Sequence, residues 1–133
     1  MARLREAKGV VYTQALAAAI PQLSGTAKSK AREALAVRLA RMTAATLRVK
    51  FKDEDPEIRR AAALACAMKE DKTHLAKLVE LLNDKEKTVT RAAYAALKSL
   101  TGQDFGPTAD ADRAEQAKAV AAWKSWVKKH GKN

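Results

Sequence analysis

Carboxylates clustered at two points are the first residues of this chain whose spacing could support chemistry. One cluster is Asp53-Glu54-Asp55, and the other pairs Asp84 with Glu86. A calcium loop needs oxygen ligands at alternating positions together with a glycine at its turn, and neither cluster has that glycine. Helix capping and turn formation account for both clusters without a metal ion.

Two histidines and one cysteine are the remaining candidates for reactive groups. His74 and His130 have no other ligand residues at metal-binding spacing, and we expect His74 to face solvent. Cys66 lies among alanines, a setting typical of a small buried core residue rather than a reactive thiol. Metalloprotease, phosphate-loop and nucleophile-elbow motifs do not occur. The sequence therefore predicts no enzyme activity, no metal and no cofactor.

Basic side chains are the most unusual feature of the composition. The chain has 26 Lys and Arg against 15 Asp and Glu, a net charge of +11. Residues 28–52 carry eight of these cations and a single acid, Glu33. Such a balance favours an acidic protein, a nucleic acid or an anionic membrane surface as partner. A run of charge is more often simply a solvated helix face, and a basic surface along the stack is the alternative.

An internal repeat indicates which elements would position these residues. Residues 56–66 match residues 87–97 at an offset of 31, and the same step backward gives a weaker match. The paired positions are Asp53 with Asp84, Ile58 with Val89, Arg60 with Arg91, Ala61 with Ala92, and, across three units, Leu16 with Leu47 and Leu78. Repeats of this length are typical of solenoids, in which each unit buries its apolar face against the next.

Each unit contains two stretches in which apolar residues recur at helical spacing. We expect helices at about 11–23, 27–40, 43–52, 56–69, 73–83 and 87–100. Abundant alanine and only 5 Gly and 3 Pro also favour helix. The sequence thus predicts one all-α domain over residues 1–133, a right-handed α-α superhelix. Its parts would be three helical hairpins (11–40, 43–69 and 73–100), a loop (101–109) and a capping helix (110–130).

The stretch from Phe51 to Ala62 resembles a HEAT repeat, in particular the PBS-lyase HEAT-like subtype. It has an aspartate at the turn, then isoleucine, arginine and paired alanines, which here are Asp53, Ile58, Arg59, Ala61 and Ala62. The third unit keeps Asp84 but has Thr90 at the arginine position, and the resemblance covers about residues 11–100. It implies an armadillo-type solenoid for protein scaffolding, with Asp53, Asp84 and Arg59 forming a structural ladder between repeats.

Two tryptophans, Trp123 and Trp126, lie three residues apart in the last predicted helix. Such aromatics can stack on nucleic-acid bases, but terminal units of a solenoid also need a cap over their apolar edge. We favour the capping role. Gly102 is expected to end the preceding helix in the left-handed conformation.

Arg60 and Arg91 share one repeat position on second helices, which line the concave side of solenoids of this type. The predicted basic binding face comprises Arg59, Arg60, Arg91, Lys98, Arg32 and Arg38.

We expect a non-catalytic protein-interaction module for an acidic or extended partner segment. It would be cytoplasmic, without a membrane span, and a fragment of a longer protein. The alternative is a basic nucleic-acid-binding solenoid. A HEAT-like DNA glycosylase is a remote enzyme candidate, because the groove aromatics of such enzymes are missing. The sequence gives no oligomeric state.

Overall fold

The computed structural model describes residues 12–130, which form helices and connecting turns without a β-strand. Residues 12–19 are helical and lead into the short 3-10 helix η1 (Ile20–Gln22). The following elements are α2 (Gly25–Ala40), α3 (Ala44–Lys50), α4 (Pro56–Met68), α5 (Leu75–Leu81), α6 (Lys87–Thr101) and α7 (Arg113–His130). The expected start of the first repeat near residue 11 lies outside the described residues.

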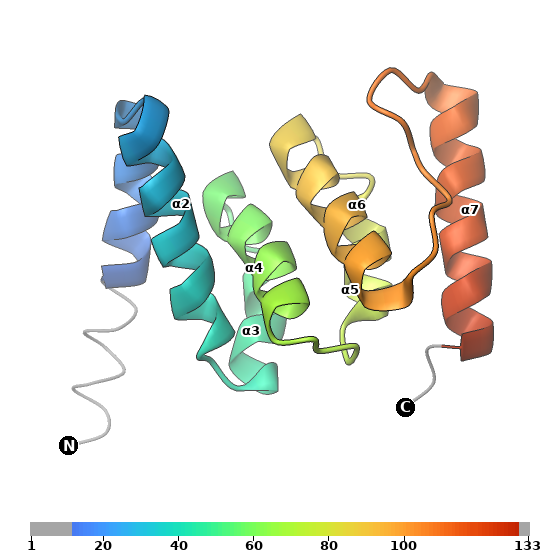
Figure 1. Ribbon diagram of the computed structural model, residues 1–133, viewed down its shortest axis with the longest axis horizontal. Coiled ribbons are helices and arrows are strands. Elements are labelled where there is room, and N and C mark those ends of the chain that lie inside the picture. Colours follow the sequence, from blue (N-terminus) through green and yellow to red (C-terminus); the bar gives the residue numbers. More distant parts are fainter. Residues whose placement is uncertain (1–11, 131–133) are drawn as a thin grey trace.

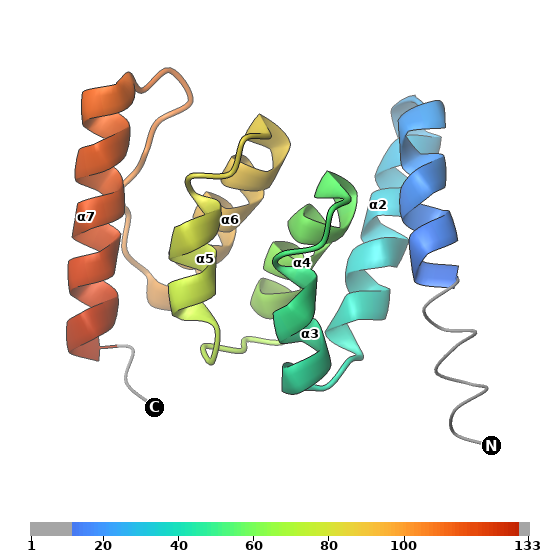
Figure 2. The ribbon, with the colours of Figure 1, turned by 180° about the vertical axis from the view of Figure 1, so that it is seen from behind.

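The helices form two layers in a curved row, which is the α-α solenoid that the repeat predicts (Figure 1). α2, α4 and α6 make one layer, which we call the second layer because it holds the second helix of each hairpin, and in it α4 packs against both of its neighbours. Residues 12–19, α3 and α5 make the first layer, which faces the viewer in Figure 2. α7 packs mainly against α5, so the row ends with no second-layer helix beyond α6. The helix of residues 12–19 and α7 lie at opposite ends of the row (Figure 1).

Local signals explain where several helices begin and end. The Asp55 carboxylate accepts a hydrogen bond from the Glu57 amide at 2.9 Å, and Pro56 occupies the first turn of α4, where its missing N–H is no loss. Gly102 ends α6 with a φ of 73°, which confirms the left-handed conformation expected from the sequence. The last helix starts later than expected, because the Asp112 carboxylate caps the Glu115 amide at 2.8 Å.

Alanine and leucine fill the space between the layers. Leu47 and Leu78, which share one repeat position, are completely buried, and so are the paired alanines at positions 62 and 93. Small side chains in the second layer let adjacent helices approach closely, while leucines on first-layer helices fill the space beneath them. Cys66 is fully buried among them, which confirms a small core residue, and burial raises the pKa of its thiol to about 12.

His74 is buried, which shows that the expected solvent-facing position was wrong. Its Nε2 atom lies 3.1 Å from the carbonyl oxygen of Ala44, and its ring packs edge-on against Phe51 at 5.4 Å. The imidazole thus joins the start of α5 to α3. Local periodicity could not reveal this contact, because its partners lie far away in the sequence.

None of the helices in the described part of the chain is both long enough and apolar enough to cross a membrane.

Candidate binding surface

Arg59 and Asp84 join the second repeat to the third. The Arg59 Nε atom donates to one carboxylate oxygen of Asp84 at 2.7 Å, and Nη2 donates to the other at 3.1 Å. Arg59 Nη1 also donates to the carbonyl oxygens of Asp53 and Glu54 at 2.8 and 3.0 Å. The two side chains are only 9% and 8% exposed, so the guanidinium is unavailable to a partner. This corrects the predicted place of Arg59 on the basic binding face.

The pKa values of this pair follow from its geometry. Although partial burial favours the neutral acid, hydrogen bonds from Arg59 and from the Glu86 amide hold the pKa of Asp84 below its ordinary value. The hydrogen bond to Asp84 raises the pKa of Arg59. Both groups therefore stay charged at neutral pH.

The preceding junction is built differently. The Asp53 carboxylate accepts a hydrogen bond from the Asp55 amide at 2.9 Å, and within residues 12–130 it forms no ion pair. Arg32 of α2 instead binds both oxygens of Glu57 in α4, at 3.0 and 2.8 Å. Arg32 is therefore part of this junction, and its predicted role on the binding face stays a prediction.

Arg38 lies at the side of α2 that faces the first helix. Its Nε atom donates to the Thr13 hydroxyl at 2.9 Å, and its guanidinium lies over the Tyr12 ring, 5.6 Å from the centroid. Arg38 therefore joins α2 to the first helix, and its predicted place on the binding face stays a prediction.

Arg60, Arg91 and Lys98 differ from the three arginines above, because no hydrogen bond within residues 12–130 holds their side chains to a neighbouring helix. Arg60 is half-buried. Its burial and, as a smaller cause, the nearby charge of Arg32 lower its pKa. Arg91 is exposed on the neighbouring helix α6. Lys98 is also exposed, 5.1 Å from the Tyr94 ring centroid and 3.6 Å from an Asp104 oxygen. The structure thus brings Arg60 and Arg91 onto adjacent helices, while Lys98 lies toward the C-terminal loop.

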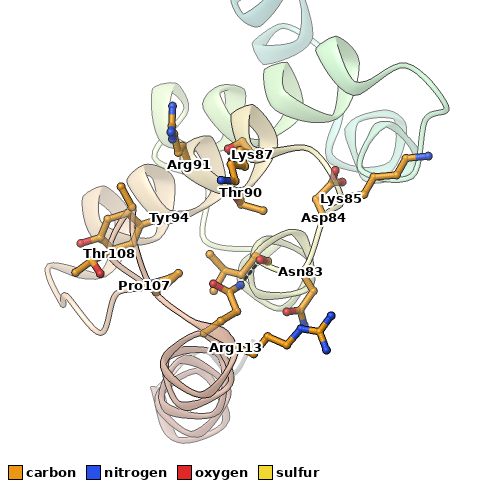
Figure 3. A pocket seen from close by; sticks show the side chains of 14 residues that line it. Asn83, Asp84, Lys85, Lys87, Thr90, Arg91, Tyr94, Pro107, Thr108 and Arg113 are labelled. Atoms are coloured by element: carbon orange, nitrogen blue, oxygen red, sulfur yellow. Dashed lines mark hydrogen bonds between the residues drawn. The ribbon is translucent and has the colours of Figure 1, made fainter.

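An open groove of about 890 Å³ lies between α6, the turn before it, and the loop that leads into α7 (Figure 3). We call it the C-terminal groove. Its lining includes four cations: Lys85, Lys87, Arg91 and Arg113. Asp84 is the one carboxylate in the lining, and its charge is already matched by Arg59. None of the four cations forms an ion pair within the part of the chain that the structure describes.

Three hydrogen-bonded contacts hold the walls of the C-terminal groove. The Gln116 side-chain amide of α7 donates to the Leu82 carbonyl oxygen at 2.5 Å. The Tyr94 hydroxyl of α6 donates to the Asp104 carboxylate at 2.5 Å, which raises the pKa of Tyr94 and lowers that of Asp104. The Asp104 carboxylate also accepts the Gly106 amide at 3.1 Å. The loop that leads into α7 is thereby fixed against α6, and the C-terminal groove between them stays open to solvent.

The two tryptophans of α7 have different surroundings. Trp123 is fully buried, packs edge-on against Phe105 at 4.8 Å, and donates its ring N–H to the Gly106 carbonyl oxygen at 2.6 Å. Trp126 is partly exposed and packs against His130, with ring centroids 4.7 Å apart. Neither residue lines the C-terminal groove.

Residues 12–130 contain no group of three or more His, Cys, Asp or Glu side chains arranged to hold a metal ion. The sequence reasoning missed the C-terminal groove and three of its four cations, Lys85, Lys87 and Arg113. A signal was present in the repeat alignment. At the offset of 31, Tyr94 and Lys98 replace Ala63 and Ala67, so small residues give way to large ones where the row of second-layer helices ends.

The family comparison agrees with this architecture. A family model described as HEAT repeats matches residues 13–98 and 43–123. Neither the curated proteins nor the solved structures give a significant match. HEAT repeats generally mediate protein interaction and scaffolding, and the family is typically non-catalytic. The matched residues span most of the chain and the helices form the expected solenoid, so this chain belongs to the HEAT repeat family.

Proposed function

We propose that the chain is a non-catalytic interaction module that holds an acidic segment of a partner protein. The observation that carries this proposal is the set of unpaired cations around α6. Internal contacts commit Arg59, Arg32 and Arg38, whereas Arg91 and the other cations of the C-terminal groove have no carboxylate partner among the described residues. Cations left unpaired at an open surface attract and orient acidic partners.

The proposed contact surface runs from α4 to α6. Arg60 and Arg91 stand at the same repeat position on these adjacent helices and together offer two guanidinium groups. Guanidinium groups suit carboxylates because their planar donors can bind both oxygens. The cytoplasmic location remains a prediction.

The test is a fluorescence-anisotropy titration with a labelled oligoglutamate peptide at low salt. The double variant Arg60→Glu/Arg91→Glu should weaken binding at least about tenfold, because two attractive contacts become repulsive. The matched control is Lys72→Glu/Lys128→Glu, which changes the net charge equally at two exposed residues outside the C-terminal groove. Equal binding by the two double variants would overturn the proposal, provided that circular dichroism shows unchanged helicity.

A nucleic-acid-binding function is the second candidate. It is favoured by exposed cations outside the contact surface that form no ion pair in the described residues, namely Lys30, Arg41, Arg48 and Lys52. The same titration with duplex and single-stranded DNA separates the candidates. Binding to DNA that is tighter than binding to the peptide and falls steeply with salt would favour phosphate contacts. DNA binding that is weaker than peptide binding would favour the protein partner.

A further inference from the structure

We infer that the C-terminal groove is the site that takes the acidic segment, in an extended conformation, between α6 and the loop that leads into α7. This inference rests on the proposed function and names its site. The four lining cations, Lys85, Lys87, Arg91 and Arg113, come from the turn before α6, from α6 itself and from the first residue of α7. The groove thus concentrates positive charge that belongs to separate elements.

The arrangement of these cations favours an extended segment over a compact anion. Figure 3 shows the charged end of Arg91 apart from those of Lys85 and Arg113 and directed another way. A segment with several carboxylates therefore suits them better than a single phosphate or carboxylate. An extended peptide advances about 3.3 Å per residue, so its successive acidic side chains can meet cations on opposite walls.

Polar groups on the groove walls suit a peptide backbone. Asn83, which is exposed, and Thr90, which is partly exposed, both line the groove. An asparagine amide can both donate to and accept from a peptide group. The groove can therefore bind main-chain groups as well as acidic side chains.

The aromatic content of the groove argues against a single-stranded nucleic acid. Proteins that bind single strands stack successive bases on aromatic side chains. Tyr94 is the one aromatic residue in the lining, Lys98 lies over its ring, and its hydroxyl is bonded to Asp104. The groove therefore lacks a series of open stacking surfaces.

The double variant Lys87→Glu/Arg113→Glu tests the site without altering Arg60 or Arg91. Both positions are the first residues of their helices, where an acidic side chain favours the helix, so the variant should fold. We expect it to bind the oligoglutamate peptide at least about tenfold more weakly than wild type. The charge-matched control Lys72→Glu/Lys128→Glu should change binding much less. In NMR titrations of wild type, the amide signals of Thr90 and Thr108 should shift.

The outcomes separate this inference from the proposed function. If Arg60→Glu/Arg91→Glu weakens peptide binding while Lys87→Glu/Arg113→Glu behaves as the control, the interaction module stands and the groove site is overturned. If wild type does not bind the peptide at low salt, both the proposed function and the groove site are overturned. If Lys87→Glu/Arg113→Glu impairs DNA binding more than peptide binding, the acidic peptide is the wrong occupant.

Discussion

Two helix faces of this molecule occupy the same repeat position but meet different neighbours. The flank of α4 that faces the next repeat is covered by α6. The corresponding flank of α6 borders the C-terminal groove. At the offset of 31, Arg59 on α4 corresponds to Thr90 on α6, and Ala63 corresponds to Tyr94. Ala63 is completely buried, while Tyr94 stays partly exposed.

This difference shows how the row of second-layer helices ends. On α4, Ala63 is small and Arg59 reaches Asp84 in the turn before α6. Both features let another repeat pack against α4. On α6, the larger Tyr94 binds Asp104 of the following loop through its hydroxyl. This arrangement leaves no equivalent place for a helix against α6. The same residue differences leave open the surface on which we propose that a partner binds.

The largest expected effect comes from Arg59→Ala. Removing one member of a buried ion pair leaves Asp84 and two backbone carbonyls without their donor, so we expect a loss of about 3 kcal/mol in the free energy of unfolding. Thr90→Ala, at the corresponding position on the open face, should lose less than about 0.5 kcal/mol. Urea denaturation measures both changes. Similar losses would mean that the two faces do not differ as described.

Substitutions at Ala63 and Tyr94, the second pair of corresponding residues, should change the free energy of unfolding less. Ala63→Tyr places a ring between α4 and α6 where no space exists, and should reduce the free energy of unfolding by about 2 kcal/mol. Tyr94→Ala removes a partly exposed ring and one hydrogen bond, so about 1 kcal/mol is expected. Thermal and urea unfolding provide the comparison. An Ala63→Tyr variant as stable as wild type would show that the α4–α6 interface is loosely packed.

The smallest expected effect is on the pH dependence of stability, and it compares Asp84 with Asp104. The pKa of each carboxylate is lowered in the folded protein, so each contributes stability that is present above the ordinary value of 3.8 and is lost as pH falls through the folded value. The stability gap between wild type and Asp84→Asn should therefore narrow below pH 3.8. Asp104→Asn should show a smaller gap throughout, because Asp104 is exposed to solvent.

This comparison is measured by urea denaturation at pH 7 and at several values between 2 and 4. A gap for Asp84→Asn that stays constant down to the lowest pH would contradict the described pairing with Arg59.

The repeat alignment was sufficient to predict the solenoid, because helical spacing and a fixed offset are properties of the sequence itself. The helical hairpins followed from it, whereas the left-handed Gly102 followed from the preference of helices to end in a glycine. Partners within the junctions were harder to predict. The pairing of Arg32 with Glu57 and the burial of His74 depend on contacts between helices that local patterns do not encode.

The C-terminal groove shows the same limit more clearly. Its walls depend on α7 packing against α5, and α7 does not follow the repeat. The change from Ala63 to Tyr94 marks the end of the row in the sequence, yet the positions of Lys85 and Arg113 around one groove follow only from the folded arrangement.

The spacing of the junction contacts has a consequence for the order in which the chain folds. Arg59 with Asp84, Arg32 with Glu57, and Arg38 with Thr13 each join residues 25 positions apart. Contacts so close in sequence give a low contact order, which is typical of fast folding. On the ribosome, each junction can form as soon as the next hairpin has emerged, so the molecule should assemble progressively from its N-terminal end.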